Sequence, residues 1–283
     1  MNHALTISGL TKTYQDFVLD HVSFTVPSGS IVGLIGENGA GKSTTIHAAL
    51  GLIQKEAGHT AILGKEELDA ETREQIGVVF DGSNYPEILS PKKINRVMKH
   101  IYRSWDEPAY LRLLKQFSLP PDKPIRQFSK GMKMKLAITA ALSHHSKLLI
   151  LDEATSGLDP VIRDDILDML LDFVQDEEHS ILISSHITSD LEKIADYIVF
   201  IHEGKVVFSK PKDELTEQYG IIKCGAAQFD AIEKSDIIVS RKMDYEWQVL
   251  ISDRDKMQKK YRDALIVPAA IDEIMLLYIK GEK

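Results

Sequence analysis

The sequence predicts an α/β fold, and the alternation of two local patterns carries that prediction. Short apolar runs of strand length recur along the chain, at residues 31–36, 76–80, 147–153, 181–186 and 198–204. Helical patterns, with apolar residues three and four positions apart, lie between the later runs, as in residues 161–174. Strand and helix in alternation favour a sheet of parallel strands covered by helices.

An antiparallel β subdomain is predicted at the N-terminus. From Val22 to Val26 the apolar residues occupy every second position, and Pro27-Ser28-Gly29 closes this run with a turn. The next run, IVGLIG, is too short for a helix and is typical of a fully buried strand.

Two further regions depart from the alternation. PKKINRVMKHIYRSW and PAYLRLLKQF predict two helices with no strand between them, so we expect an inserted helical subdomain over about residues 85–145. After residue 215, a hairpin around Met243-Asp244-Tyr245 and a final amphipathic helix indicate a small α+β extension. The predicted domains are therefore 1–215 and 216–283.

Composition narrows the class of protein. The chain has 283 residues, is 43% hydrophobic and 27% charged, and carries a formal net charge of −8. This acidic balance argues against a nucleic-acid-binding protein. The single cysteine, Cys224, rules out an intrachain disulfide. We see no signal peptide and no window of 18 uninterrupted apolar residues, so the chain is not expected to span a membrane by itself.

A glycine-rich motif points to phosphate binding. GENGAGKST, residues 36–44, fits the pattern G-x-x-x-x-G-K-[ST] and lies between a predicted buried strand and a helix. Backbone N–H groups of such a loop and the positive end of the helix face phosphate oxygens. Lys42 would bridge the last two phosphates of ATP, and the Ser43 hydroxyl would bind Mg²⁺. The predicted nucleotide-binding residues of this loop are Gly36, Asn38, Gly39, Ala40, Gly41, Lys42, Ser43 and Thr44.

Acidic and imidazole side chains follow two other predicted strands. LLILDE places Asp152 at the end of a strand, where ligands bind in open α/β sheets, and there it would hold Mg²⁺ through water. Glu153 would polarise the water that attacks the terminal phosphate. His186 ends the strand ILISSH and would contact that phosphate and the attacking water.

Together these motifs resemble the ATP-binding subunit of an ABC transporter, over about residues 4–215. The family's motifs appear in order as GENGAGKST, VVFDG, the helical subdomain, FSKGM, LLILDE, SGLD and His186. The resemblance implies a P-loop NTPase core and an ATPase that powers transport through a separate membrane permease. It also implies a cytoplasmic location, peripheral on the inner face of the membrane through that permease.

The basic stretch QFSKGMKMKL corresponds to the family's signature segment. Ser129 is a good N-cap for a helix, and the resemblance implies that Ser129 and Gly131 face the nucleotide held by a second subunit. That partner is an identical chain or a similar ATPase. Lys133 and Lys135 are then expected on the outer face of the helix as solvated charges.

Two departures from the family pattern affect this interpretation. Lys130 and Met132 replace glycine and glutamine in the signature, a form that resembles the bacterial drug and peptide exporter branch. Asp81 stands where the family has a glutamine, and a carboxylate there is expected to approach Mg²⁺ or the attacking water. Tyr14 matches the aromatic that stacks on adenine in the family.

Two other functions stay open on the sequence alone. One is an ABC-type ATPase that acts as a mechanical or regulatory module without a permease. The other is a nucleotide-binding subunit with an inactive site, which the presence of Lys42, Ser43, Asp152, Glu153 and His186 disfavours.

Overall fold

A computed structural model describes residues 2–82 and 84–282. The strands are β1 (His3–Thr13), β2 (Val18–Pro27), β3 (Ile31–Ile35), β4 (Ala57–Ile62), β5 (Ile76–Val79), β6 (Leu148–Asp152), β7 (Ser180–Ser185), β8 (Tyr197–His202), β9 (Lys205–Pro211), β10 (Gly220–Cys224), β11 (Val239–Lys242), β12 (Trp247–Ile251) and β13 (Leu265–Pro268). The α-helices are α1 (Lys42–Ala49), α2 (Ala70–Glu74), α3 (Pro91–Ile101), α4 (Glu107–Gln116), α5 (Lys130–Leu142), α6 (Pro160–Phe173), α7 (Thr188–Ile194), α8 (Ala226–Phe229), α9 (Arg254–Lys260) and α10 (Ile271–Lys280).

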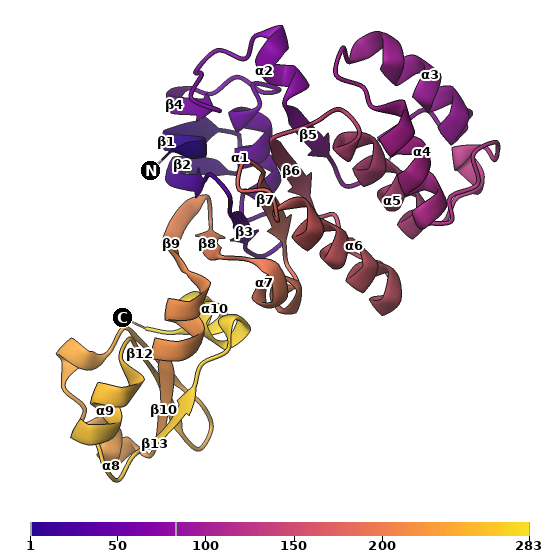
Figure 1. Cartoon of the computed structure of the whole chain (residues 1–283). Coiled ribbons are helices and arrows are strands. Elements are labelled where there is room, and N and C mark those ends of the chain that lie inside the picture. The colour runs from indigo at the N-terminus through magenta and orange to yellow at the C-terminus, as the bar shows by residue number, and fades with distance from the viewer. Residues whose placement is uncertain (1, 83, 283) are drawn as a thin grey trace.

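The central sheet has six strands in the order β5-β6-β7-β3-β8-β9 (Figure 1). The first five are parallel, and β9 pairs antiparallel with β8. Every residue of β3, β6 and β7 is buried, because other layers cover both faces of the sheet. The predicted α/β fold and the predicted strands are thus confirmed.

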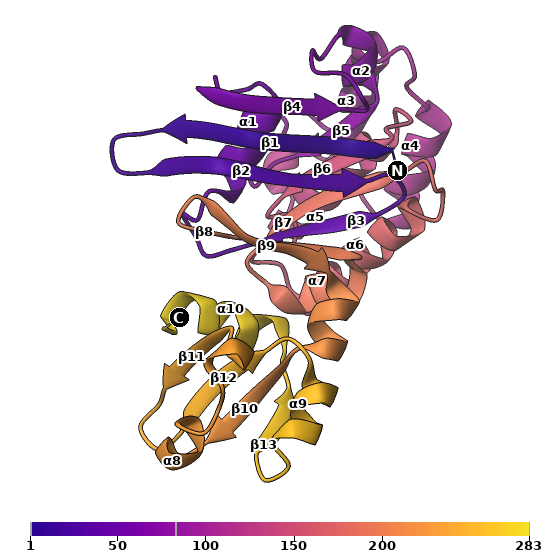
Figure 2. The same ribbon diagram turned by 90° about the vertical axis from the view of Figure 1, so that its left-hand side faces the viewer.

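Alternate side chains of the central sheet enter two separate hydrophobic cores. Val32 and Leu34 of β3 pack with β1, β2 and α1, whereas Ile31 and Ile35 of the same strand pack with α5, α6 and α7. The first core joins the central sheet to the predicted N-terminal antiparallel sheet, whose strand order is β2-β1-β4 (Figure 2).

Helices α3, α4 and α5 form the predicted helical subdomain beyond the β5 edge of the sheet (Figure 1). Their shared core is built around Tyr110, which is fully buried and donates a hydrogen bond from its hydroxyl to the Pro91 carbonyl at 3.0 Å. Helix α5 contributes to this core and also to that of the central sheet. It is therefore the element that ties the subdomain to the rest of the chain.

The C-terminal extension is an antiparallel sheet in the order β11-β12-β10-β13, with the predicted hairpin between β11 and β12. Helix α10 lies between this sheet and the main body of the protein (Figures 1 and 2). The ring of Tyr278 is 5.6 Å from that of Phe208 on β9, and the Ile271 amide donates to Glu192 Oε1 on α7 at 3.1 Å. The amphipathic helix thus packs on the main domain.

The predicted boundary at residue 215 falls within a π-helical turn, Glu214–Gln218, whose Leu215 is fully buried. One hydrophobic core continues from the central sheet through Leu215 and α10 to the near face of the C-terminal sheet. No helix among the described residues combines the length and the apolar character needed to cross a membrane.

Candidate nucleotide-binding site

The loop between β3 and α1 depends on glycine at two positions. Gly41 has a φ of 111°, and a Cβ there would lie 2.9 Å from the Phe17 ring. At Gly36 a Cβ would lie 2.4 Å from the carbonyl oxygen of Ile201. Only glycine fits these positions, and the tight loop they permit delivers the chain to the start of α1.

Lys42 opens α1 with its ammonium group turned back into the loop. The residue is 5% exposed, and Nζ donates hydrogen bonds to the carbonyl oxygens of Gly36 at 2.8 Å and Glu37 at 3.1 Å. Nζ also lies 3.1 Å from Glu153 Oε1. A buried cation requires such partners, so its position at the loop is well determined.

The carboxyl ends of β6 and β7 bring the predicted acidic residues and the histidine together. Asp152 is 5% exposed and accepts a hydrogen bond from Ser184 Oγ at 2.6 Å. Glu153 has a φ of 53°, and its Oε2 lies 2.6 Å from Nδ1 of His186. The left-handed backbone turns the Glu153 side chain away from the path of the strand and toward Lys42 and His186.

Ser184 was not predicted, although it organises both acidic residues. Its hydroxyl donates to Asp152 and accepts the backbone N–H of Glu153 at 3.0 Å. The residue is buried on β7, and its sequence context, ILISSH, resembles an ordinary strand end. Only the pairing of β6 with β7 places it opposite Asp152.

A cavity of about 740 Å³ connects these groups. Its lining residues are Asp16, Phe17, Asn38, Gly39, Gly41, Lys42, Ser43, Thr44, Asp81, Glu153, Ser156 and His186. Six of the eight predicted loop residues and the three predicted catalytic residues therefore meet at one cavity, whereas Gly36, Ala40 and Asp152 are outside its lining. Asp16, Phe17 and Ser156 also line it and had not been predicted from the sequence.

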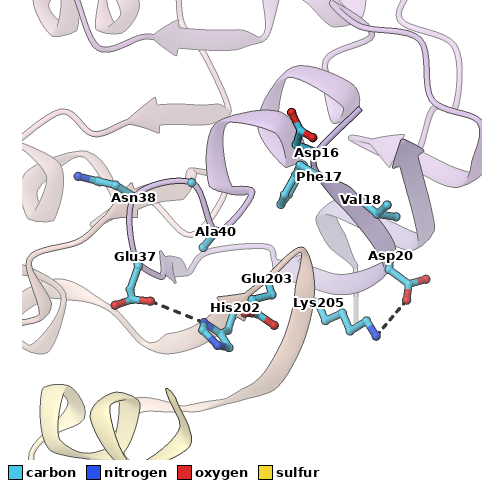
Figure 3. A pocket seen from close by; sticks show the side chains of 11 residues that line it. Asp16, Phe17, Val18, Asp20, Glu37, Asn38, Ala40, His202, Glu203 and Lys205 are labelled. Carbon is cyan, nitrogen blue, oxygen red and sulfur yellow. Dashed lines mark ion pairs between the residues drawn. The ribbon is translucent and has the colours of Figure 1, made fainter. Parts of the chain in front are cut away.

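A second cavity, of about 580 Å³, adjoins the first on the outer side of the phosphate loop (Figure 3). The two share Asp16, Phe17, Asn38 and Gly39. In Figure 3, His202 at the end of β8 faces Glu37 of the loop, with Nδ1 and Oε2 3.8 Å apart. Together the two cavities make a trough that runs past the phosphate loop from His202 and Lys205 at one end, past the shared Phe17, to Glu153 at the other.

Tyr14 is outside the lining of both cavities. It is 44% exposed, and its ring stands 6.5 Å from that of Phe17 and 5.6 Å from Lys12 Nζ. Phe17 is instead the aromatic residue that both cavities share. The stacking role of Tyr14 stays a prediction, and Phe17 is a second candidate that spacing alone did not reveal.

The predicted signature residues stand at the start of α5. The Met132 amide donates to Ser129 Oγ at 3.2 Å, so Ser129 is the N-cap, as predicted. Gly131 is buried against α6, where a Cβ would lie 2.6 Å from Ile162 Cδ1. Neither Ser129 nor Gly131 lines the cavity that holds Lys42.

Two lysines of α5, Lys133 and Lys135, were expected to be solvated charges, but both form ion pairs. Lys133 Nζ lies 2.6 Å from Glu87 Oε1, and Lys135 Nζ lies 2.6 Å from Asp165 Oδ2. The Lys135 side chain is only 12% exposed. The prediction of solvated charges is therefore wrong for Lys135, because the stem of this side chain packs at the α5–α6 interface while its charge is paired.

The groups around this cavity suit a nucleoside triphosphate. Lys42 and the start of α1 supply positive charge on one side of it, and the cavity has the volume of a ligand site. The Ser43 hydroxyl is exposed toward the cavity and makes no hydrogen bond within residues 2–82 and 84–282. A hydroxyl and nearby carboxylates are ligands that Mg²⁺ prefers.

Comparison with known proteins identifies the family. The ABC transporter family model matches residues 19–156. The lantibiotic transport ATP-binding protein SrtF of Streptococcus pyogenes is 36% identical over 212 residues, which cover 74% of this chain and 91% of SrtF. The chain belongs to the ABC transporter ATP-binding family.

Further matches of this ABC protein agree in sequence and in structure. The bacitracin transport ATP-binding protein BcrA of Bacillus licheniformis is 33% identical over 223 residues, 77% of this chain and 73% of BcrA. A solved ATP-binding subunit of an ABC transporter superposes with a TM-score of 0.66 at 31% identity and covers 75% of this chain and 91% of that one. The P-loop NTPase fold is thus confirmed, as is the prediction of a subunit that binds and hydrolyses ATP to power transport.

Proposed function

We propose that this chain powers the export of a drug-like or peptide-like amphipathic compound through a separate membrane permease. The observation that carries the proposal is the single cavity that joins Lys42, Ser43, Glu153 and His186. The direction and the kind of cargo rest on likeness to the lantibiotic and bacitracin transport proteins.

In this proposal each residue of the cavity has a separate task. Lys42 would bind the last two phosphates, and Ser43, which lines the cavity with Asp81, would bind Mg²⁺. Asp152 does not line the cavity; it is buried at the end of β6, beside Ser184, and would hold Mg²⁺ through water. Bound Mg²⁺ would offset the charge that develops on the transferred phosphoryl group. Glu153 accepts a proton from the attacking water, and His186, 2.6 Å from its carboxylate, holds Glu153 in position.

A second ATP-binding subunit completes the site. The α5 start, with Ser129 and Gly131, is separated from the chain's own phosphate cavity and presents a capped helix terminus at the surface. Such a terminus suits the phosphate of a nucleotide bound to another copy, which gives a head-to-tail dimer. An identical chain or a similar ATPase fills this role.

The permease would dock where the helical subdomain meets β5. A cavity of about 310 Å³ there is lined by Val78, Phe80, Asn84, Tyr85, Met98, Tyr102, Ala140, Ala141 and His144. Aromatic walls, with Tyr102 and His144 stacked 4.1 Å apart, suit a short amphipathic helix from a membrane protein. Through this contact the chain would sit on the cytoplasmic face of the membrane, with no nucleic acid among its partners.

Light scattering on the Glu153→Gln variant tests the dimer. This change keeps the shape of the site but removes the base, so the ATP-bound form persists. We expect a shift from monomer to dimer only in the presence of Mg²⁺ and ATP. A monomer that still binds ATP would show that two identical copies do not suffice and would favour a different ATPase partner.

Isolation of the tagged chain from solubilised membranes tests the permease. We expect an integral membrane protein to co-purify, and to be lost when Tyr102→Asp places a charge in the aromatic cavity. Recovery of the chain without any integral membrane protein would contradict the transport proposal and favour a module that works without a permease.

A further inference from the structure

Two of the three positions at which this chain departs from the family pattern, Lys130 and Asp81, lie beside each other in space. Lys130, at the first position of α5, has Nζ 3.5 Å from Oδ1 of Asp81, in the loop after β5. The residues are 49 positions apart in the chain and come from different layers of the structure. Each of these two substitutions introduces a charge, and the two opposite charges of Lys130 and Asp81 form an ion pair.

This pair stands at the end of the trough where the terminal phosphate belongs. Asp81 lines the cavity with Ser43, Glu153 and His186, whereas the other end of the trough is lined by His202 and Lys205. A Cβ on Gly157 would lie 3.3 Å from Lys130 Nζ, so the ammonium group is close to the loop that follows Glu153. Lys130 therefore pairs with Asp81 beside the catalytic loop.

A carboxylate at this place carries an electrostatic cost. Asp81 adds a negative charge near Glu153, on the side of the cavity that must accept the most highly charged part of ATP. A neutral glutamine would add none. Lys130 supplies the missing positive charge from another element, and its place in the helix is the one that the family pattern gives to glycine.

We propose that Lys130 is a positioning residue of the nucleotide site, which acts through Asp81 by offsetting its charge at the terminal-phosphate end. The inference rests on the proposed assignment of this cavity to ATP. It predicts that the first turn of α5 influences how tightly the chain's own site holds a triphosphate, although no α5 residue lines that cavity.

The structure offers a matched control on the same two elements. Lys133 of α5 pairs with Glu87 of the same loop at 2.6 Å, but neither residue lines the phosphate cavity. Both lysine pairs join α5 to the loop after β5. Of the two pairs, only the Lys130 pair includes a residue, Asp81, that lines the phosphate cavity.

The test is a set of equilibrium binding measurements with fluorescent ATP and ADP analogues on the full chain. With Lys130→Met, the Kd for ATP should rise about three- to tenfold and that for ADP less than about twofold, because only ATP places a γ-phosphate near the partly exposed Asp81. The double change Lys130→Met with Asp81→Asn should restore the ATP affinity to within about twofold. Lys130→Arg should bind like the parent, and Lys133→Met should leave both affinities unchanged.

Several results would overturn the inference. Equal losses for ATP and ADP would indicate a general structural defect. A double variant as weak as Lys130→Met would mean that Lys130 acts directly and not through Asp81, and unchanged binding in Lys130→Met would show that the pair has no role. Thermal unfolding without nucleotide identifies a folding defect separately. Loss of hydrolysis in Lys42→Ala tests the proposed function separately. The proposed function can therefore be correct even where the Lys130 measurements contradict the inference.

Discussion

The starts of α1 and α5 are two candidate phosphate-binding helix termini, and the chain completes only one of them. At α1 the loop is closed by glycines, the lysine is buried and tied to three oxygens, and a cavity is formed. At α5 the N-cap is satisfied by Ser129, but Lys130 is about half exposed and Ser129 and Gly131 line none of the phosphate cavity. The comparison teaches that a helix terminus becomes a site only when other elements enclose it.

The largest expected effect comes from removing the enclosed lysine. Lys42→Ala should lower ATP hydrolysis by at least about 100-fold, because it removes the buried positive charge that faces the phosphates and leaves Glu153 without its cation. Phosphate release at saturating ATP measures this. Lys147→Ala removes an exposed lysine paired with Glu178 and serves as the control with full activity. Retention of more than a tenth of the activity in Lys42→Ala would contradict the assignment of Lys42 as the phosphate-binding lysine.

The next largest effects are expected at two glycines, one at each helix start. Gly41→Ala should weaken ATP binding by at least about tenfold, since the left-handed backbone is strained by a Cβ and the Phe17 ring lies 2.9 Å away. Gly131→Ala presses on Cδ1 and Cγ2 of Ile162, which does not line the phosphate cavity, and should leave ATP binding to the single chain unchanged.

The same Gly131→Ala protein should nevertheless lose ATP-dependent dimer formation and most of its hydrolysis. Calorimetric binding and light scattering measure the two properties separately. If Gly131→Ala lost ATP binding as strongly as Gly41→Ala, Gly131 would belong to the chain's own nucleotide site. The distinction between the starts of α1 and α5 would then be wrong.

A smaller effect separates capping from phosphate contact at Ser129. Ser129→Ala should lower the free energy of unfolding by about 1 kcal/mol, because the Met132 amide loses its partner. Ser129→Asp keeps the cap and the stability, but its carboxylate would repel the second copy's nucleotide, so hydrolysis should fall. Urea unfolding and phosphate release distinguish the two; equal hydrolysis in Ser129→Asp and the parent would argue against a contact in trans.

The smallest effect concerns pH at the other end of α5. His144 is 2% exposed, and burial lowers its pKa despite its hydrogen bond to the Glu74 carbonyl at 2.8 Å. The folded protein therefore takes up this proton less readily than the unfolded chain. Stability is fully present above the ordinary histidine pKa of about 6.5 and declines as the pH falls below it, by at most about 1.4 kcal/mol per pH unit.

His144→Gln should reduce that decline, as measured by urea unfolding at pH 7.5, 6.5 and 5.5. The exposed neighbour His145 provides the control, because His145→Gln should leave the slope unchanged. A slope identical in His144→Gln and the parent would show that this buried imidazole does not set the acid sensitivity.

Local sequence was sufficient wherever a residue's role depends on its immediate neighbours. The buried strands, the helical subdomain, the β11–β12 hairpin and the N-cap at Ser129 all follow from periodicity and turn chemistry, and the structure confirms them. The motif GENGAGKST located the phosphate loop because its glycines act within a few residues of each other.

Contacts between elements distant in sequence required the tertiary structure. Ser184 reaches Asp152 only because β7 lies beside β6, Phe17 reaches Gly41 only because the N-terminal sheet covers the loop, and Lys135 is buried only where α6 meets α5. The Lys130–Asp81 pair belongs with these. The sequence by itself thus determined the loop, the strands and the chemistry of each acid or base, since these depend on local spacing. The fold decided which charges face one another, because that depends on how separate elements pack.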